Sequence, residues 1–463
     1  MWGKVLTGAM LTGTLMLSGC GGDSSDRPAK AEAAKGEAYF VDNAVSGLRY
    51  QCGSEGFKLT GEQGLLSCDA GQTVSFYVGD ILLGQARMAA GTGFITPLTL
   101  ATVEGVVDEN KMANIARFLI SLDMDADPNN GIQIDPDVHI NTELALDFSL
   151  PPASFETAAG PVLTAFSQVV DGDAFALVSE NDALDHLIVG LFVANAGYYE
   201  GTINRGMGVT SKLAFLVTRE GAAYGVNLSA EGMYTSAAFN EEDEHFDPSG
   251  LGADFMIDGE TGATYYLDVE AGNGKVSGYD TMDQFPTFTS TRKVAFKPLA
   301  DFDLVESLDE LVPFAIDLTG NEDYFIIDYN DDLMVGTLYS AWGATPPSNN
   351  PEKEFVEYDI VVADMVSGED GVMRLMALST NGYVVDIEID FTGEELVVNA
   401  NWKHVFENRS GVSSTYETHF EYGGEPGPGP EPEGPIELMS LDKSKAVEAG
   451  PGRRGSGSSG MFR

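Results

Sequence analysis

Apolar and acidic side chains alternate at every second position in several stretches between residues 196 and 422. In one of them, β-branched residues are interleaved with acids from Val385 to Asp390. Two further stretches have the same spacing: Tyr265, Leu267 and Val269, and then Tyr416, Thr418, Phe420 and Tyr422. Successive side chains of a strand point to opposite faces, so each stretch predicts a strand with one buried and one solvated face. We therefore predict an antiparallel β domain over residues 196–422, either a sandwich or a barrel of roughly eight to twelve strands.

Between residues 96 and 195 the apolar spacing becomes helical, which predicts a helical segment. Asp108 is placed to cap a helix over Glu109–Leu122. The apolar residues of this helix fall on one stripe: Met112, Ile115, Ala116, Leu119 and Leu122. Ser154 begins a second candidate helix, which extends to about Val170.

A third helix is predicted to begin after Ser179, with Asp182 three residues further on as a variant capping box. Its apolar face consists of Leu184, Leu187, Ile188, Leu191 and Phe192. His186 falls opposite these leucines, so we expect its side chain to be exposed to solvent.

The first nineteen residues have the three parts of a bacterial export signal. Lys4 provides a short positive region, the apolar run Val5–Leu17 follows, and Leu17-Ser18-Gly19-Cys20 resembles the lipobox of bacterial lipoproteins. The apolar run is shorter than the ~20 residues of a transmembrane helix. We predict cleavage before Cys20 and a lipid anchor on that cysteine. Gly21, in place of aspartate, favours the outer membrane.

Two further segments have compositions that do not support a folded core. Residues 20–37 are mostly Gly, Ser, Asp, Ala, Glu and Lys, and we interpret them as a polar tether between the membrane and the folded body. Residues 423–463 are rich in Pro, Gly and Ser, and we expect them to be disordered.

The net charge of the chain is extreme. It contains 72 acidic and 25 basic residues, which gives a formal charge of −47. Such a surface repels nucleic acid and anionic lipid headgroups and attracts cations, so nucleic acid is excluded as a partner. Adaptation to salty surroundings explains the charge without any specific acidic binding role.

Residues 38–95 contain short apolar runs separated by glycine turns, which predicts a small β module. Cys52 and Cys68 lie within it, sixteen positions apart. If Cys20 carries lipid and the chain is exported, these two cysteines are in an oxidising compartment and predict one disulfide. Two buried free thiols are the alternative.

Four short stretches resemble a group of uncharacterised bacterial envelope lipoproteins: Val45–Gly53 (V-S-G-L-R-Y-Q-C-G), Gly79–Gly84 (G-D-I-L-L-G), Asn114–Leu119 (N-I-A-R-F-L) and Leu122–Ile132 (L-D-M-D-A-D-P-N-N-G-I). The resemblance covers about residues 39–195. It implies a location in the cell envelope, and it implies no activity, because the group has none that is settled.

The best candidate for chemistry is the loop that begins with Asp123, Asp125 and Asp127. Three carboxylates on alternate residues can converge on one hard cation, and Ca²⁺ prefers six to eight oxygen ligands. Further oxygens are available from Asn129, from a backbone carbonyl near Gly131, and from Asp135 or Asp137. The loop departs from an EF-hand, because Pro128 replaces the turn glycine and Ile134 replaces the bidentate glutamate. A polar loop at the end of a helix is the alternative.

Other polar clusters are weaker candidates. The run Glu241–His245 is typical of a solvated loop, and Asp328, Asp331 and Asp332 predict a hairpin turn. The five histidines have no metal-ligand spacing: His139, His186, His245, His404 and His419. The sequence has no nucleophile elbow and no phosphate loop.

Three functional hypotheses remain at this point. The leading one is a lipid-anchored, non-enzymatic protein that binds or adheres to an envelope partner or ligand. The second is an envelope-attached hydrolase of an extracellular polymer, with its carboxylates in the C-terminal β domain. The third is a purely structural part of the envelope. Converging carboxylates in an aromatic-lined cavity would favour the enzyme.

Overall fold

The computed structural model describes residues 35–139, 144–170, 174–204, 208–219, 223–228, 234–239, 252–259, 264–270, 274–280, 287–298, 311, 314–318, 324–330, 333–340, 356–369, 371–379, 382–393 and 395–418. The predicted export signal, the tether up to residue 34, the acidic run 241–245 and the tail 423–463 lie outside these residues. The tether is shorter than predicted, because strand β1 (Lys35–Phe40) already includes residues 35–37.

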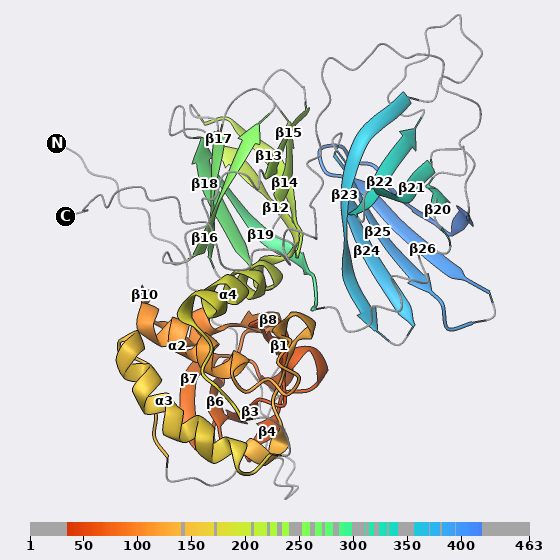
Figure 1. Cartoon of the computed structure of the whole chain (residues 1–463). Coiled ribbons are helices and arrows are strands. Elements are labelled where there is room, and N and C mark those ends of the chain that lie inside the picture. The colour runs from red at the N-terminus through yellow and green to blue at the C-terminus, as the bar shows by residue number, and fades with distance from the viewer. Residues whose placement is uncertain are drawn as a thin grey trace, which may run out of the picture.

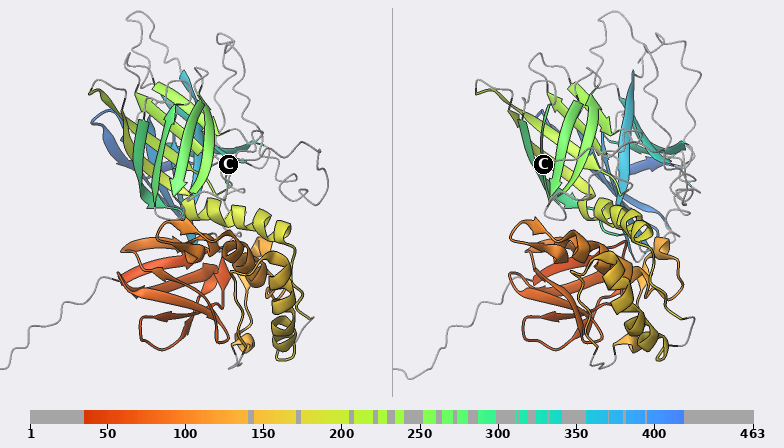
Figure 2. Two further views of the ribbon diagram at one scale, coloured as in Figure 1. Left: turned by 90° about the vertical axis from the view of Figure 1, so that its left-hand side faces the viewer. Right: turned by 60° about the vertical axis from the view of Figure 1, so that its left-hand side comes forward.

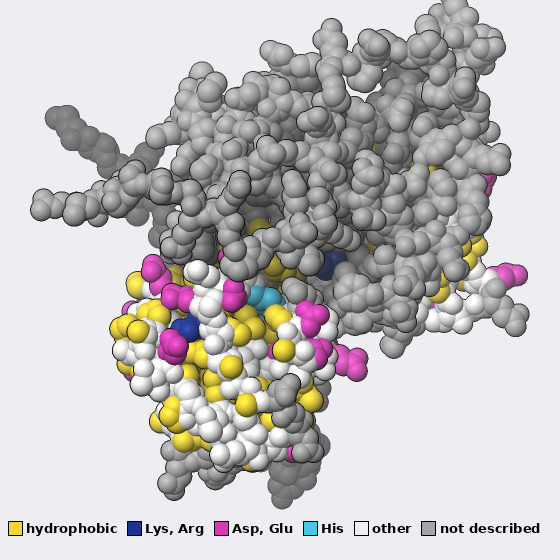
Figure 3. Space-filling view, viewed as in Figure 1, with side chains coloured by type: hydrophobic (Ala, Val, Ile, Leu, Met, Phe, Trp, Pro, Cys, Tyr) yellow, Lys and Arg dark blue, Asp and Glu magenta, His cyan; other side chains and the backbone are white. Residues whose placement is uncertain are grey.

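The protein is mainly β, as predicted, and it consists of three bodies (Figure 1). We call residues 35–195 the N-terminal domain. A barrel (residues 197–295) and a separate sheet (residues 314–417) follow it in the chain. Both lie on the same side of the N-terminal domain, above it in Figures 1 and 2. On the face of the N-terminal domain seen in Figure 3, the acidic side chains lie mostly in the upper part, towards these two bodies.

Two small sheets and four helices form most of the N-terminal domain. The first sheet has the strand order β5 (Leu65–Asp69), β1 and β8 (Gly91–Ile95), and the second has the order β4 (Lys58–Leu59), β3 (Arg49–Cys52), β6 (Thr73–Val78) and β7 (Ile81–Arg87). Two short pairs join β2 (Val45–Ser46) to β11 (Ile132–Gln133), and β9 (Thr102–Val103) to β10 (Val106–Val107). The helices are α1 (Pro97–Ala101), α2 (Glu109–Ile120), α3 (Pro152–Ser167) and α4 (Glu180–Asn195).

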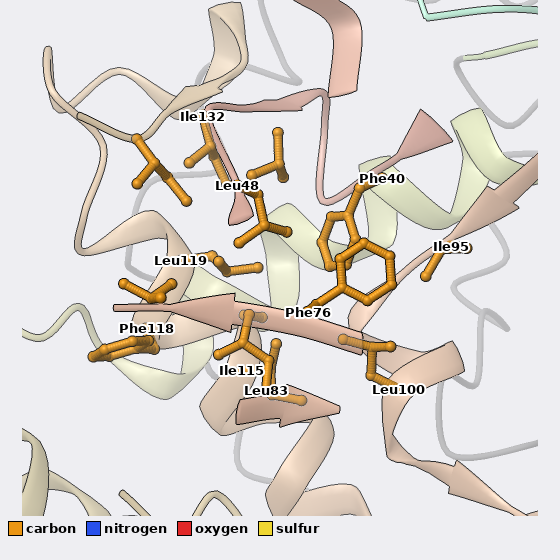
Figure 4. Close-up of a cluster of buried hydrophobic side chains, with 14 of the residues drawn as sticks. Phe40, Leu48, Phe76, Leu83, Ile95, Leu100, Ile115, Phe118, Leu119 and Ile132 are labelled. Carbon is orange, nitrogen blue, oxygen red and sulfur yellow. The ribbon is translucent and has the colours of Figure 1, made fainter. Parts of the chain in front are cut away.

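One continuous hydrophobic core runs through this domain, from Ala38 to Leu191 (Figure 4). Phe40 and Phe76 of the strands and Ile115 and Leu119 of α2 belong to the same cluster of buried side chains. The predicted β module 38–95 and helical segment 96–195 therefore form a single structural unit.

The predicted disulfide between Cys52 and Cys68 is present, with Cα atoms 5.8 Å apart. It joins the end of β3 to β5, and thus connects the two small sheets. Both cysteines are buried in the common core, so the bond contributes packing as well as a covalent constraint.

Local hydrogen bonds explain where the helices begin. The Asp108 carboxylate accepts from the Lys111 N–H, and the Ser179 hydroxyl accepts from the Asp182 N–H, as both predicted caps require. The second helix begins at Pro152 rather than after Ser154, because proline fits the first helical position. Within the described residues, we find no helix long and apolar enough to cross a membrane.

An antiparallel closed barrel follows α4 directly. In the described part of the chain it has eight strands in sequential order: β12 (Gly197–Asn204), β13 (Thr210–Val217), β14 (Ala223–Leu228), β15 (Tyr234–Phe239), β16 (Gly252–Gly259), β17 (Thr264–Glu270), β18 (Lys275–Asp280) and β19 (Thr287–Ala295). Strand β12 pairs with β19 along its whole length and closes the barrel. Gly201 permits this approach, because a side chain there would collide with the Thr289 carbonyl.

The last body is a nine-stranded antiparallel sheet, counted over the described residues. Its strands are β20 (Phe314–Asp317), β21 (Tyr324–Asn330), β22 (Leu333–Ser340), β23 (Val356–Glu369), β24 (Val372–Leu378), β25 (Tyr383–Asp390), β26 (Val397–His404), β27 (Ser410–Ser413) and β28 (Thr415–Glu417). Val385, Ile387 and Ile389 are buried as predicted. Strands β21 and β22 pair as a hairpin, but Asp328 lies within β21, and Asp331 and Asp332 of the predicted turn are outside the described residues.

Contacts between the bodies are both apolar and polar. Arg292 of β19 donates to the carbonyl of Ala194 in α4 at 2.7 Å, and its guanidinium lies over the ring of Phe94. A mixed apolar cluster joins the barrel to the sheet, with Tyr198 and Leu216 on one side and Met376 and Leu378 on the other. The predicted β domain 196–422 thus contains a barrel and a sheet that pack together.

Candidate functional site

The predicted cation loop folds back against the start of the chain. It follows α2 and ends at β11, which pairs with β2 in parallel. The Asp123 side chain is buried, and its Oδ1 accepts the Gln133 N–H at 2.8 Å. Its other oxygen, Oδ2, is also buried, and no hydrogen bond from the described residues reaches it. Asp123 therefore presents one unsatisfied oxygen within the loop.

Asp125 is exposed and holds the loop together. Its Oδ1 accepts the Asp127 N–H at 3.0 Å, and its Oδ2 accepts from the Asn130 side chain at 2.9 Å. Its carboxyl also lies close enough to the Asp123 carboxyl to raise the pKa of Asp123. The loop thus brings two of the three predicted carboxylates together, and N–H groups of the loop already occupy part of the space that a cation would need.

The two carboxyls differ in their affinity for protons. Burial raises the pKa of Asp123 to about 6, and the nearby Asp125 adds to this rise, while the N–H groups of Gln133 and Asp127 oppose it. The hydrogen bond from Asn130, followed by that from the Asp127 N–H, lowers the pKa of Asp125. Asp123 is consequently the member of this pair that takes up a proton first on acidification.

Two of the remaining predicted ligands, Asp135 and Asp137, lie on the turn that follows β11. Asp135 caps the 3₁₀ turn Pro136–Val138, and Asp137 is exposed on that turn. Asn129 lies in the 3₁₀ turn Pro128–Asn130, and its side chain is outside the described part of the structure. Within the described ranges, we find no group of three or more His, Cys, Asp or Glu side chains arranged to hold a metal ion.

A second polar group lies behind this loop and was missed by the sequence analysis. Asp42, which follows β1, is fully buried, and neither of its carboxylate oxygens accepts a hydrogen bond from the described residues. His186 of α4 lies beside it, with Nδ1 3.5 Å from Asp42 Oδ1. The other ring nitrogen, Nε2, lies 3.0 Å from the carbonyl of Pro128 in the acidic loop. His186 therefore bridges the start of the chain and the loop.

The expected exposure of His186 is wrong, since only 8% of it is accessible. The reason is a close approach of α4 to the backbone at Asp42 and Asn43. A Cβ atom at Gly190 would lie 3.0 Å from both the Asp42 Cα and the Asn43 nitrogen, so only glycine fits there without displacement. The small residues Ala183, Gly190 and Ala194 share the face of His186, and this spacing was the available signal for a second buried face.

Charge pairing governs the protonation of His186. Burial by itself lowers its pKa, but the nearby Asp42 carboxylate, with smaller contributions from the Pro128 carbonyl and Asp123, raises the pKa above its ordinary value. When His186 is protonated, it places a positive charge next to the buried Asp42 carboxylate, with Nδ1 3.5 Å from Oδ1. The pair of Asp42 and His186 thus connects the end of β1, the acidic loop and α4. Both side chains are buried, so a ligand in solvent does not reach them.

Polar residues in the stretches that resemble envelope lipoproteins make hydrogen bonds within the N-terminal domain. Asn114 donates to the carbonyls of Phe148 and Leu150, and Arg117 donates to the carbonyl of Val178. His139 accepts the Gly79 N–H at Nδ1, and its Nε2 contacts the Gly47 carbonyl at 2.8 Å. Each of these side chains connects segments that are far apart in sequence.

The histidines of the C-terminal half add no candidate ligands within the described residues. His404 is buried, and its Nδ1 accepts the N–H groups of Phe406 and Glu407 at a turn. His245 and His419 lie outside the described residues.

Comparison with known proteins identified no matching family model, no similar curated protein and no similar solved structure. The resemblance to envelope lipoproteins therefore stays a prediction.

Proposed function

We propose that this chain is a lipoprotein, anchored to the outer membrane through Cys20, that binds or adheres to an envelope partner or supports the envelope structurally. The serial arrangement of its three bodies supports this proposal. The N-terminal domain begins at Lys35, fifteen residues after Cys20, and the barrel and the nine-stranded sheet are attached to it through α4 and β19. An anchored domain of this kind presents the two β bodies to whatever lies beyond the membrane surface.

The anchor is tested by mass spectrometry of protein from the native membrane. We expect a mature N-terminus at an acylated Cys20. The Cys20→Ala variant should accumulate as an uncut precursor or leave the membrane fraction, because the thiol that carries the lipid is lost. An unmodified Met1 on the mature protein would contradict the proposal.

The acidic loop also supports a proposal of calcium binding within this function. Asp123 Oδ2 is buried and accepts no hydrogen bond from the described residues, and the nearby Asp125 raises the pKa of Asp123. Neighbouring carboxylates repel one another, and a proton or a cation relieves that repulsion. A bound Ca²⁺ would contact Asp123 and Asp125, with water and loop oxygens completing its shell. Asp127 and Asn129 remain candidate ligands.

We expect Ca²⁺ to raise the melting temperature, because a ligand that binds only the folded state stabilises it by about 2.7 kcal/mol at a hundredfold excess over Kd. Mg²⁺ should stabilise the protein less, since it requires a rigid octahedron. The difference between the two ions should vanish in Asp125→Asn. Thermal unfolding at equal ion concentrations measures this.

Asp147→Asn is the matched control for the calcium experiment. Asp147 is exposed and accepts the Ser149 N–H at 3.0 Å, the same local hydrogen bond that Asp125 makes to Asp127. This variant should keep the preference for Ca²⁺. Equal responses of the wild-type protein to both ions would indicate diffuse screening of the −47 charge and no site.

A further inference from the structure

A row of exposed apolar side chains crosses the outer face of the β4–β3–β6–β7 sheet. The strand register aligns Leu59 with Arg49, Arg49 with Tyr77, and Tyr77 with Leu82, so all four residues face the same side. Phe57 lies over this row: its ring is 3.6 Å from the Arg49 guanidinium and 5.4 Å from the Tyr77 ring. We call Phe57, Leu59, Tyr77 and Leu82, with Arg49 between them, the outer-sheet patch.

The outer-sheet patch is more exposed than a core-forming surface would be. Phe57 is 49% accessible, Leu59 42% and Leu82 45%. The opposite face of the same sheet packs in the common core of the N-terminal domain. Aromatic and aliphatic side chains that cluster on a surface mark an interaction site. The Arg49 side chain contributes an apolar stem and a planar cation stacked on Phe57, as side chains at a membrane–water interface do.

Local charge makes this patch unusual in so acidic a chain. Arg49 lies 3.7 Å from Asp80, and Lys58, next to the patch, is paired with Glu55 at 2.9 Å. Each cation here has an acidic partner, whereas the whole chain carries −47. Repulsion of phosphate headgroups is therefore reduced at the patch, where each of these acids has a cation beside it.

The chain between the anchor and the fold favours the membrane as the occupant. The fourteen residues 21–34 separate Cys20 from β1, and fourteen residues span at most about 50 Å even when fully extended. The N-terminal domain itself has a radius of gyration of about 15 Å for its size. An acylated Cys20 would therefore hold the N-terminal domain within reach of the bilayer, and the face nearest the tether would meet it first.

The tether also enters near the patch-bearing sheet. Lys35 pairs with Asp69, and the next pair, Gly36 with Cys68, is joined through the disulfide to Cys52 at the end of β3. Strands β3 and β4 lie at the end of the N-terminal domain away from the barrel and the nine-stranded sheet (Figure 1).

We propose that the outer-sheet patch docks on the lipid surface to which Cys20 anchors the chain, and that this contact orients the two β bodies away from the membrane. The inference rests on the proposed lipid anchor. The acyl chain supplies the affinity for the membrane, and the patch selects which face of the domain meets the headgroups.

The test uses full-length Phe57→Trp protein, purified from cells that process its export signal and reconstituted with vesicles of phosphatidylethanolamine and brominated phosphatidylcholine. We expect the indole at position 57 to show blue-shifted emission and to be quenched by the brominated chains, after subtraction of the wild-type signal. Val412→Trp is the matched control. Val412 is 73% exposed on β27 of the nine-stranded sheet, and an indole at this position should remain in water and unquenched.

Flotation of the same vesicles separates the two proposals. Protein that does not float has no anchor, and the proposed function fails. Protein that floats while the indole at position 57 stays unquenched overturns the docking of the patch. Shielding of that indole only in native membranes, or only at high protein concentration without lipid, would identify a protein partner or a second copy as the occupant and would also overturn it.

Discussion

Replacing His186 with alanine is expected to lower the free energy of unfolding by about 3–5 kcal/mol, the usual cost of leaving a buried charge without its partner. Asp42 is fully buried, and no hydrogen bond from the described residues compensates its carboxylate. Chemical denaturation at pH 6 measures the effect. In an Asp42→Asn background the same substitution should cost much less, because no buried charge is then left unpaired.

The contribution of His186 should also depend on pH. Its pKa in the folded protein lies above the ordinary value of 6.5, so the folded state binds more protons between these two values. The stability supplied by the pair is therefore complete below pH 6.5 and is lost as the pH rises through the folded-state pKa. A pH series of unfolding curves should show this decline in the wild-type protein and lose it in His186→Ala.

His139 is the natural control for this experiment. Burial lowers the pKa of His139, although the Gly47 carbonyl and Asp135 oppose the change. The unfolded state then binds more protons, and this histidine adds stability as the pH rises, the opposite sign. A His139→Ala variant should keep the decline in stability above pH 6.5. If it loses that decline and His186→Ala retains it, the assignment of the titrating group is wrong.

Removing the disulfide should cost about 3 kcal/mol, the value expected for a closed loop of roughly fifteen residues. Cys52→Ala/Cys68→Ala leaves both positions apolar but small. Because these cysteines lie in the core that also contains α2 and α4, we expect the whole N-terminal domain to lose protection from hydrogen exchange together. Exchange measured by mass spectrometry, with and without reductant on the wild-type protein, tests this.

The result that would contradict this expectation is a loss of protection confined to residues 39–84. That pattern would mean that the β module opens alone, as its position in the sequence suggests. An unchanged free energy of unfolding in the double variant would show that the disulfide contributes little beyond the packing of its sulfur atoms.

Features that depend on neighbouring residues could be predicted from the sequence. Asp108 and Ser179 cap their helices through hydrogen bonds to N–H groups three residues away, so the sequence contains both partners. The burial of Val385, Ile387 and Ile389 follows from the geometry of a single strand. The pairing of Cys52 with Cys68 followed from elimination, once Cys20 was assigned to lipid.

Features that depend on distant residues appeared only in the tertiary structure. Apolar residues alternate with a period of two in the strands of a sandwich and of a barrel alike. The pairing of β12 with β19, about ninety positions apart, makes residues 197–295 a barrel. The acidic loop was recognised, but the N–H groups that occupy Asp123 and Asp125 come from its folded backbone.

The candidate site shows the same division between local and distant information. The sequence by itself determined where acids, caps and cysteines lie along the chain, because spacing sets which side chains share one strand or helix face. Only the tertiary structure decided that His186 is buried, since Gly190 brings α4 against Asp42, almost 150 positions away. Burial and charge pairing are properties of the packed chain, and a single helix pattern contains no information about the partner of its second face.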